Sequence, residues 1–186
     1  MVSAGFQLGP LVRKVLFILG QLEDVDVEWM AGVGQKRTIE AGQILISQGT
    51  PIDALFFMLE GECEVFLRSG KILARLGSGE ILGELSFVDA APPSASVRAT
   101  LRTKVLAVPK KAIEARMRQD TAFAARFYKA IAIFLSDRLR AMVAAAGHGP
   151  EADDGGLQAD ELDTSVLDRL HQAGARFDAM LRKLQS

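Results

Sequence analysis

Short apolar runs separated by glycines occupy the chain between residues 40 and 109. From the N-terminal side, the runs are ILIS, ALFFMLE, CEVFLR, KILARL and SVRATLRTKVLAV. The glycines between them recur about every 8 to 12 residues, which is the spacing of turns in a compact antiparallel sandwich or barrel; they are Gly42, Gly49, Gly61, Gly70 and Gly79. We therefore predict a mixed α+β fold built on a jelly-roll-like antiparallel β-roll of about eight strands, flanked by an N-terminal helix and C-terminal helices.

The run GECEVFL shows which face of one predicted strand is buried. Cys63 and Val65 alternate with Glu62 and Glu64, so we expect the first pair in the core and the two glutamates in solvent. Because Cys63 is the only cysteine, no internal disulfide and no cysteine-based metal cluster can form. This fits a reducing compartment, and we expect the protein in the cytoplasm.

The pattern changes to a helical period after Pro109. KKAIEARMRQ at 110–119 predicts a short amphipathic helix, and Asp120 or Thr121 can cap a second helix that continues to Gly147. The second helix is apolar on more than one face, so we expect it to contact both the β-roll and another chain, giving a homodimer through residues 121–146. Its main stripe is Phe127, Ile131, Leu135, Leu139 and Met142.

The segment GHGPEADDGG, which begins at Gly147, has the composition of a flexible linker. We predict one domain over 1–147, a linker over 148–158 and an amphipathic helix over 159–186. A lone amphipathic helix is unstable in water. We therefore expect 159–186 to dock onto a protein partner or onto a second copy of the chain.

The N-terminal stretch VLFILGQL at 15–22 predicts a core-facing helix, because eight residues are too few to span a membrane. The chain contains 22 basic and 23 acidic residues, for a net charge of -1, so nothing in its charge indicates nucleic acid or an anionic membrane as a partner. Only 36 residues follow Pro150, which leaves no room for a DNA-reading winged helix. We expect no direct DNA contact and no membrane span.

The sequence offers little for catalysis or metal binding. Its two histidines, His148 and His171, fall in the predicted linker and terminal helix, so the roll has no imidazole base or ligand. We expect no enzymatic activity, no catalytic residues, no metal site and no cofactor.

Two short motifs near the centre of the chain carry a resemblance. GSGEILGEL at 77–85, followed by PPSASVRA at 92–99, resembles the phosphate-binding cassette of the cyclic nucleotide-binding domain. That family includes catabolite activator proteins, kinase regulatory subunits and cyclic-nucleotide-gated channels, and the resemblance covers residues 11–146. It implies a β-roll flanked by helices, with cAMP or cGMP as ligand.

The resemblance also implies roles for individual residues. A helix N-terminus favours anions, and in the family such a turn faces the cyclic phosphate. Glu84 would accept a hydrogen bond from the ribose 2′-hydroxyl, or would cap the adjoining helical turn. The serines correspond to hydroxyls that contact ligand in some members, or would make local turn bonds. The implied ligand-binding residues are Gly83, Glu84, Leu85, Ser86, Ser94 and Ser96, with Met142 and Val143 covering the base.

The chain departs from the family pattern at Pro93, which occupies the position of the phosphate-binding arginine. A hydrogen bond to a charged group contributes roughly 1.5 to 3 kcal/mol, so its loss weakens binding about tenfold to somewhat over a hundredfold. Arg98 is either a substitute cation or a solvated side chain on the emerging strand.

Two functions follow. In one, the protein is a non-enzymatic cyclic-nucleotide sensor with weak or altered cAMP or cGMP binding that signals through protein contacts. In the other, it is a ligand-independent interaction or dimerisation module of the same fold that binds a partner through its C-terminal helix. Pro93 is the position that distinguishes the two functions.

Overall fold

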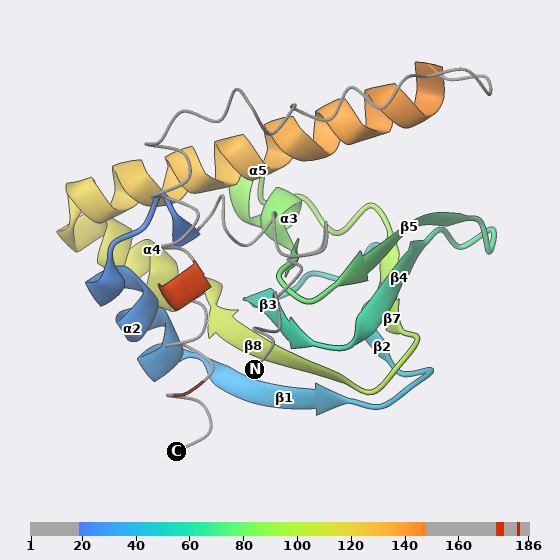
Figure 1. Cartoon of the computed structure of the whole chain (residues 1–186), viewed down its shortest axis with the longest axis horizontal. Coiled ribbons are helices and arrows are strands. Elements are labelled where there is room, and N and C mark those ends of the chain that lie inside the picture. Colours follow the sequence, from blue (N-terminus) through green and yellow to red (C-terminus); the bar gives the residue numbers. More distant parts are fainter. Residues whose placement is uncertain (1–18, 148–173, 177–181, 183–186) are drawn as a thin grey trace, which may run out of the picture.

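Two four-stranded antiparallel sheets face each other and form a β-roll (Figure 1). The structure is a computed structural model that describes residues 19–147, 174–176 and 182. In order of pairing, one sheet contains β1 (Gln35–Ile39), β8 (Thr103–Pro109), β3 (Ala54–Glu60) and β6 (Ile81–Leu82), and the other contains β2 (Ile44–Ile46), β7 (Ser96–Ala99), β4 (Glu62–Phe66) and β5 (Ile72–Gly77). The predicted fold class and strand number are confirmed.

Strand β3 reads as an uninterrupted apolar run because both of its faces are covered. Phe56 and Met58 point into the roll, where they pack with Cys63, Val65 and residues of the second sheet. Leu55, Phe57 and Leu59 alternate with them and pack under the helices. The protein therefore has two apolar cores that share one sheet.

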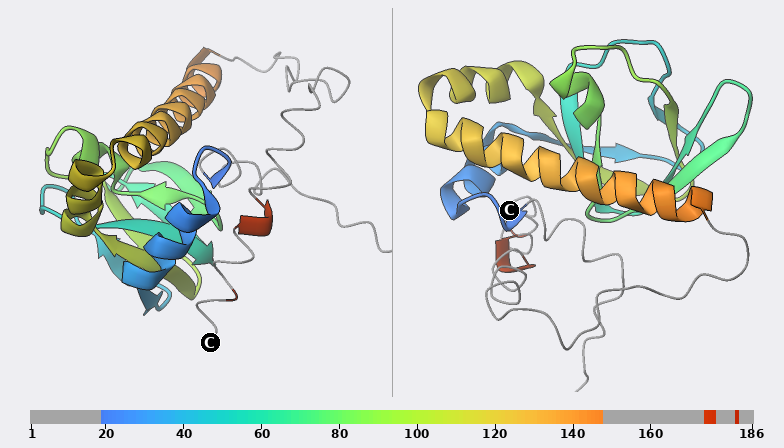
Figure 2. Two further views of the ribbon diagram at one scale, coloured as in Figure 1. Left: turned by 90° about the vertical axis from the view of Figure 1, so that its left-hand side faces the viewer. Right: turned by 90° about the horizontal axis from the view of Figure 1, so that it is seen from above.

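The second core lies between that sheet and three helices, α2 (Asp24–Val33), α4 (Lys110–Gln119) and α5 (Thr121–Gly147). The short helix α3 (Glu84–Val88) lies between α5 and the roll (Figures 1 and 2). Both predicted C-terminal helices are confirmed. The cap is Asp120, whose Oδ1 accepts a hydrogen bond from the backbone N–H of Phe123 at 2.8 Å.

All five glycines predicted at turns adopt a positive φ, between 80° and 98°. Gly61 is the most restricted of them, because a Cβ there would lie 2.5 Å from Thr103 Oγ1. Only glycine fits this tight connection between β3 and β4.

Glu64 lies where the alternation placed an exposed residue, and that prediction is wrong. Its carboxylate is buried and pairs with Arg98 on the neighbouring strand β7. Cys63 and Val65 are buried, as predicted. The alternation correctly gave the facing of the strand, but it could not show that a cross-strand arginine covers the outer face.

Several N- and C-terminal predictions fall wholly or partly outside the described residues. The predicted helix at 15–22 is described only from Leu19, which is helical. Residues 20–22 form a turn and a bend, so the predicted helical end at Leu22 is wrong. Leu19 and Leu22 are buried in the core under the helices, as the prediction of a core-facing segment required. The linker at 148–158 lies outside entirely, and of the helix at 159–186 only 174–176 and 182 are described; these residues are helical.

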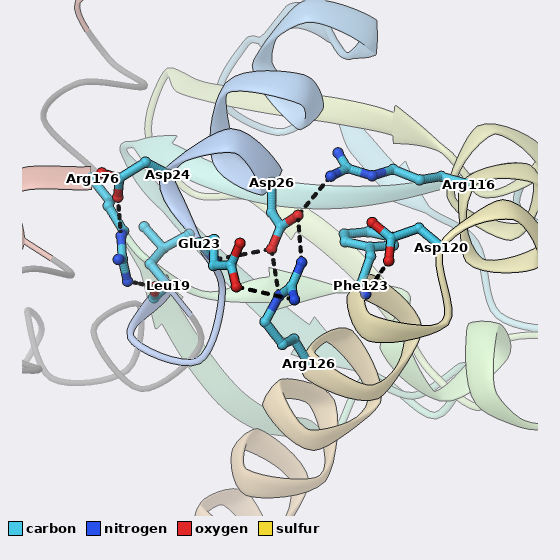
Figure 3. Close-up of polar contacts among 9 residues, drawn as sticks. All are labelled: Leu19, Glu23, Asp24, Asp26, Arg116, Asp120, Phe123, Arg126 and Arg176. Carbon is cyan, nitrogen blue, oxygen red and sulfur yellow. Dashed lines mark hydrogen bonds and ion pairs between the residues drawn. The ribbon is translucent and has the colours of Figure 1, made fainter.

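A buried ion-pair cluster fastens α2 to α4 and α5 (Figure 3). Asp26 is completely buried and accepts hydrogen bonds from Arg116 of α4 at 2.6 Å and from Arg126 of α5 at 2.9 and 3.2 Å. The guanidinium of Arg116 also stacks between the rings of Trp29 and Phe123, with its carbon 4.6 and 4.3 Å from their centroids. One carboxylate thus joins three helices.

Candidate binding pocket

An open pocket lies at one side of the roll, bounded by α3, the loop before β7 and α5. Its wall contains apolar side chains from the interior of the roll and a few polar groups from the surrounding turns. The lining residues are Ile46, Val65, Leu82, Gly83, Glu84, Leu85, Ser86, Pro93, Ser94, Ala95, Val97 and Arg138. Five of the eight residues implied by the sequence therefore meet in one place.

Gly83 sets the entry to α3. It is the N-cap residue and has a φ of 86°, in the left-handed region. A Cβ at this position would lie 2.5 Å from Ile52 Cδ1, so a side chain would be both strained and crowded. The glycine lets the chain turn abruptly from β6 into α3, which places Glu84 at the pocket wall.

Glu84 is the buried acid of the pocket, and its partner comes from α5. Its side chain is 3% exposed, and Oε1 accepts a hydrogen bond from Arg138 Nη1 at 2.7 Å. Burial raises the pKa of the Glu84 carboxyl, and the positive charge of Arg138 opposes part of that rise. Arg138 is the only basic residue among the described residues that line the pocket.

Replacing Glu84 with glutamine is expected to remove a pH-dependent part of the stability. Because the pKa of Glu84 is raised in the folded state, its contribution is fully present below the unfolded-state pKa. It is lost as pH rises through the folded-state pKa. Urea unfolding across the acid and neutral range should therefore show that the Glu84→Gln variant gains stability relative to the wild type as pH rises.

Glu60→Gln is the matched control with the opposite sign. Lys104 lowers the pKa of the exposed Glu60 carboxyl, so the contribution of Glu60 is present above its unfolded-state pKa and lost as pH falls. If the profiles of stability against pH run parallel for the wild type and the Glu84→Gln variant, burial does not raise the pKa of the Glu84 carboxyl.

The loop before β7 forms another part of the pocket wall. Pro93 is half-buried, and its carbonyl accepts a hydrogen bond from the backbone N–H of Gly49 at 2.8 Å. Ser94 is exposed at the pocket wall. Ser96 is buried but is not a lining residue; its Oγ accepts a hydrogen bond from the backbone N–H of Gln48 at 3.0 Å. The Ser96 hydroxyl thus makes a local loop contact.

Three other residues singled out from the sequence lie away from the pocket. Arg98 faces outward on β7, pairs with Glu64 and lies over the ring of Phe66. Met142 and Val143 are exposed near the end of α5 and are not lining residues. Sequence reasoning missed Arg138 altogether, because only the packing of α5 beside α3 brings it to Glu84.

Metal-binding side chains do not gather in the described part of the chain. It contains no cluster of three or more histidine, cysteine, aspartate or glutamate side chains able to hold a metal ion. Within the same residues, no helix combines the length and apolarity needed to cross a membrane.

The chain is similar in sequence to parts of several known proteins. Glutaminase 1 of Bradyrhizobium diazoefficiens is 31% identical over 121 residues, which are 63% of this chain and 20% of that protein. The cGMP-dependent protein kinase of Caenorhabditis elegans is 41% identical over 98 residues, which are 53% of this chain and 12% of the kinase. The chain spans 24% or less of the length of the first curated relatives that it matches.

The fold and the family model agree with these matches. The crystal structure of a cyclic nucleotide-binding domain from Methylobacillus flagellatus has a TM-score of 0.65 and 22% identity, covering 76% of this chain and 86% of that chain. The family model for the cyclic nucleotide-binding domain matches residues 36–120, which include α3 and the loop before β7. Residues 36–120 therefore form a domain of the cyclic nucleotide-binding domain family.

Proposed function

We propose that this protein is a non-enzymatic regulator whose pocket binds cAMP or cGMP weakly and in an altered mode, and that it signals by changing how α5 contacts other proteins. The observation that carries the proposal is the Glu84–Arg138 pair, which joins the pocket to α5. The family match supports a cyclic nucleotide as the ligand.

The chemistry of a cyclic nucleotide suits both members of the pair. The ribose hydroxyl is a donor for the Glu84 carboxylate, and the cyclic phosphate is an anion for the Arg138 guanidinium. These two side chains satisfy each other in the present structure. The phosphate of a bound nucleotide would therefore have to replace the Glu84 carboxylate as the partner of Arg138.

This exchange explains both the low affinity and the signal. Breaking a buried charge pair opposes binding, and Pro93 offers no cation from the loop in compensation. Because Arg138 belongs to α5, a change of its partner alters what holds α5 against the pocket. The ligand thus acts on α5 because it binds more strongly when that helix lies in one position against the pocket than when it lies in another.

Isothermal titration calorimetry on the full chain tests the proposal. We expect cAMP, cGMP or both to bind with a dissociation constant no tighter than micromolar. Arg138→Ala should weaken that binding by about tenfold or more, since Arg138 is the only basic residue among the described residues that line the pocket. The matched control is Arg140→Ala, which removes an exposed arginine two residues along α5 and should leave the affinity unchanged.

Three results would contradict the proposal. A nanomolar constant would show that the pocket contains a strong phosphate site and that the exchange with Glu84 is not limiting. Equal affinities for the Arg138→Ala variant and the wild type would show that α5 takes no part in binding. Absence of binding by either nucleotide would favour the ligand-independent function.

An exposed apolar patch favours that second candidate, an interaction module that dimerises through α5. Phe127 and Ile131 are buried in the domain's own core, so they are not available to a second chain. Leu139, Met142 and Val143, near the C-terminal end of α5, are each more than 60% exposed. A dimer through 121–146 would use these three side chains.

A further inference from the structure

A contact from the C-terminal segment reaches back to the N-terminal edge of the domain. Arg176 Nε donates a hydrogen bond to Asp24 Oδ1 at 2.5 Å, and Arg176 Nη1 donates one to the carbonyl oxygen of Leu19 at 2.9 Å (Figure 3). The described residues 174–176 are helical. Residues separated by more than 150 positions in the chain therefore meet at the start of α2.

The geometry of this contact suits arginine. The two acceptors come from different places, an acidic side chain in the first turn of α2 and a backbone carbonyl five residues earlier. The planar fork of a guanidinium can donate to both at once, whereas an ammonium group is a single point charge. The Arg176 side chain is 17% exposed, whereas the Asp24 carboxylate is 75% exposed.

The contact lies on a rigid part of the domain. Leu19 is buried in the core, which fixes the position of its carbonyl group. Two residues after Asp24, Asp26 holds α2 to Arg116 and Arg126. In Figure 3, Arg176 approaches α2 from one side, and the Arg116 and Arg126 side chains approach from the other.

We propose that the C-terminal segment around 174–176 docks on α2 of its own chain, with Arg176 as the clamp. Residues 148–173 connect α5 to this segment within the same chain, so the effective concentration of the segment at α2 does not depend on the protein concentration. An outside partner of the C-terminal helix would have to displace this contact. The inference does not rest on nucleotide binding.

NMR of the ¹⁵N-labelled full chain tests the docking. We expect Arg176→Ala to raise the undocked population by about tenfold, seen as shifts of the amide signals of residues 19–25. Arg176→Lys should give an intermediate shift, because it keeps the charge but loses the fork. Asp24→Asn should also give a partial effect, since the Leu19 carbonyl remains.

The matched control is Arg182→Ala, which removes an exposed arginine from the same segment and should leave the signals of 19–25 in place. Wild-type spectra should not change with protein concentration. Light scattering should give the same molecular mass for the wild type and the Arg176→Ala variant. Unshifted signals in the Arg176→Ala variant would overturn the proposal. Equal shifts in the Arg182→Ala variant would also overturn it. Signals that move with concentration, together with a doubled mass, would show that the occupant of this α2 surface is a second copy.

Discussion

Asp26→Ala is expected to lower the free energy of unfolding by about 3 to 5 kcal/mol, since it removes one partner from a buried ion-pair cluster. Asp26 is fully buried, and its carboxylate accepts hydrogen bonds from two arginines on two different helices. Without it, Arg116 keeps its charge next to the apolar core but loses this acceptor, and Arg126 keeps only its ion pair with Glu23 at 3.1 Å. The variant also loses the bond that Asp26 accepts from the backbone N–H of Glu23 at 2.9 Å.

Chemical denaturation followed by circular dichroism measures this loss. The control is Glu40→Ala, which breaks an exposed ion pair with Arg102 and should cost no more than about 1 kcal/mol. Asp26→Asn should fall between the two, because it keeps the shape and an acceptor oxygen but loses the charge. A cost below about 1 kcal/mol for Asp26→Ala would mean that α2 is not held by this cluster.

Pro93→Arg is expected to tighten cyclic-nucleotide binding by about tenfold to somewhat over a hundredfold. Position 93 lines the pocket and is only half-buried, so a long side chain can extend from it. The hydrogen bond from Gly49 to the carbonyl of residue 93 does not depend on the proline ring. The guanidinium of the new arginine would pair with the phosphate, and the Glu84–Arg138 pair could stay intact. Glu84→Ala in the same background should remove the gain.

Calorimetry with cAMP and cGMP measures this change, and the neighbouring proline provides the control. Pro92→Arg makes the same chemical change at an exposed residue that does not line the pocket, so its affinity should match the wild type. If the Pro93→Arg variant folds and gains no more than the Pro92→Arg variant, position 93 does not face the phosphate. The ligand-independent function would then be favoured.

The sequence predicted the roll because its signals are local. Glycines with positive φ separate the strands, and Asp120 caps α5 through a side chain three residues from its partner. Strand β1, with the sequence QKRTI, and the two-residue strand β6 were not predicted. Their sequences do not alternate clearly, and pairing with β8 and β3 determines their structure.

The candidate site shows the same difference between residues placed by local sequence signals and residues placed by long-range packing. Five residues that the motif singled out line one pocket, because they belong to two short segments near each other in the chain: Gly83, Glu84, Leu85, Ser86 and Ser94. Arg138 follows Glu84 by 54 positions and meets it only through the packing of α5. Helix periodicity could not show that one arginine of α5 turns inward while Arg140, two residues later, is exposed.

Cys63 gives the protein a built-in reporter of its own opening. It is the only cysteine in the chain, and it is completely buried between the two sheets. Burial also raises the pKa of its thiol, so neither access nor ionisation favours reaction with an alkylating reagent while the roll is closed. The labelling rate under native conditions therefore follows the equilibrium between closed and open roll, without any added denaturant. Because Cys63 is buried, the surface of the described residues carries no cysteine thiol. A single cysteine introduced on α2 or α5 would therefore react selectively with a dye or spin label.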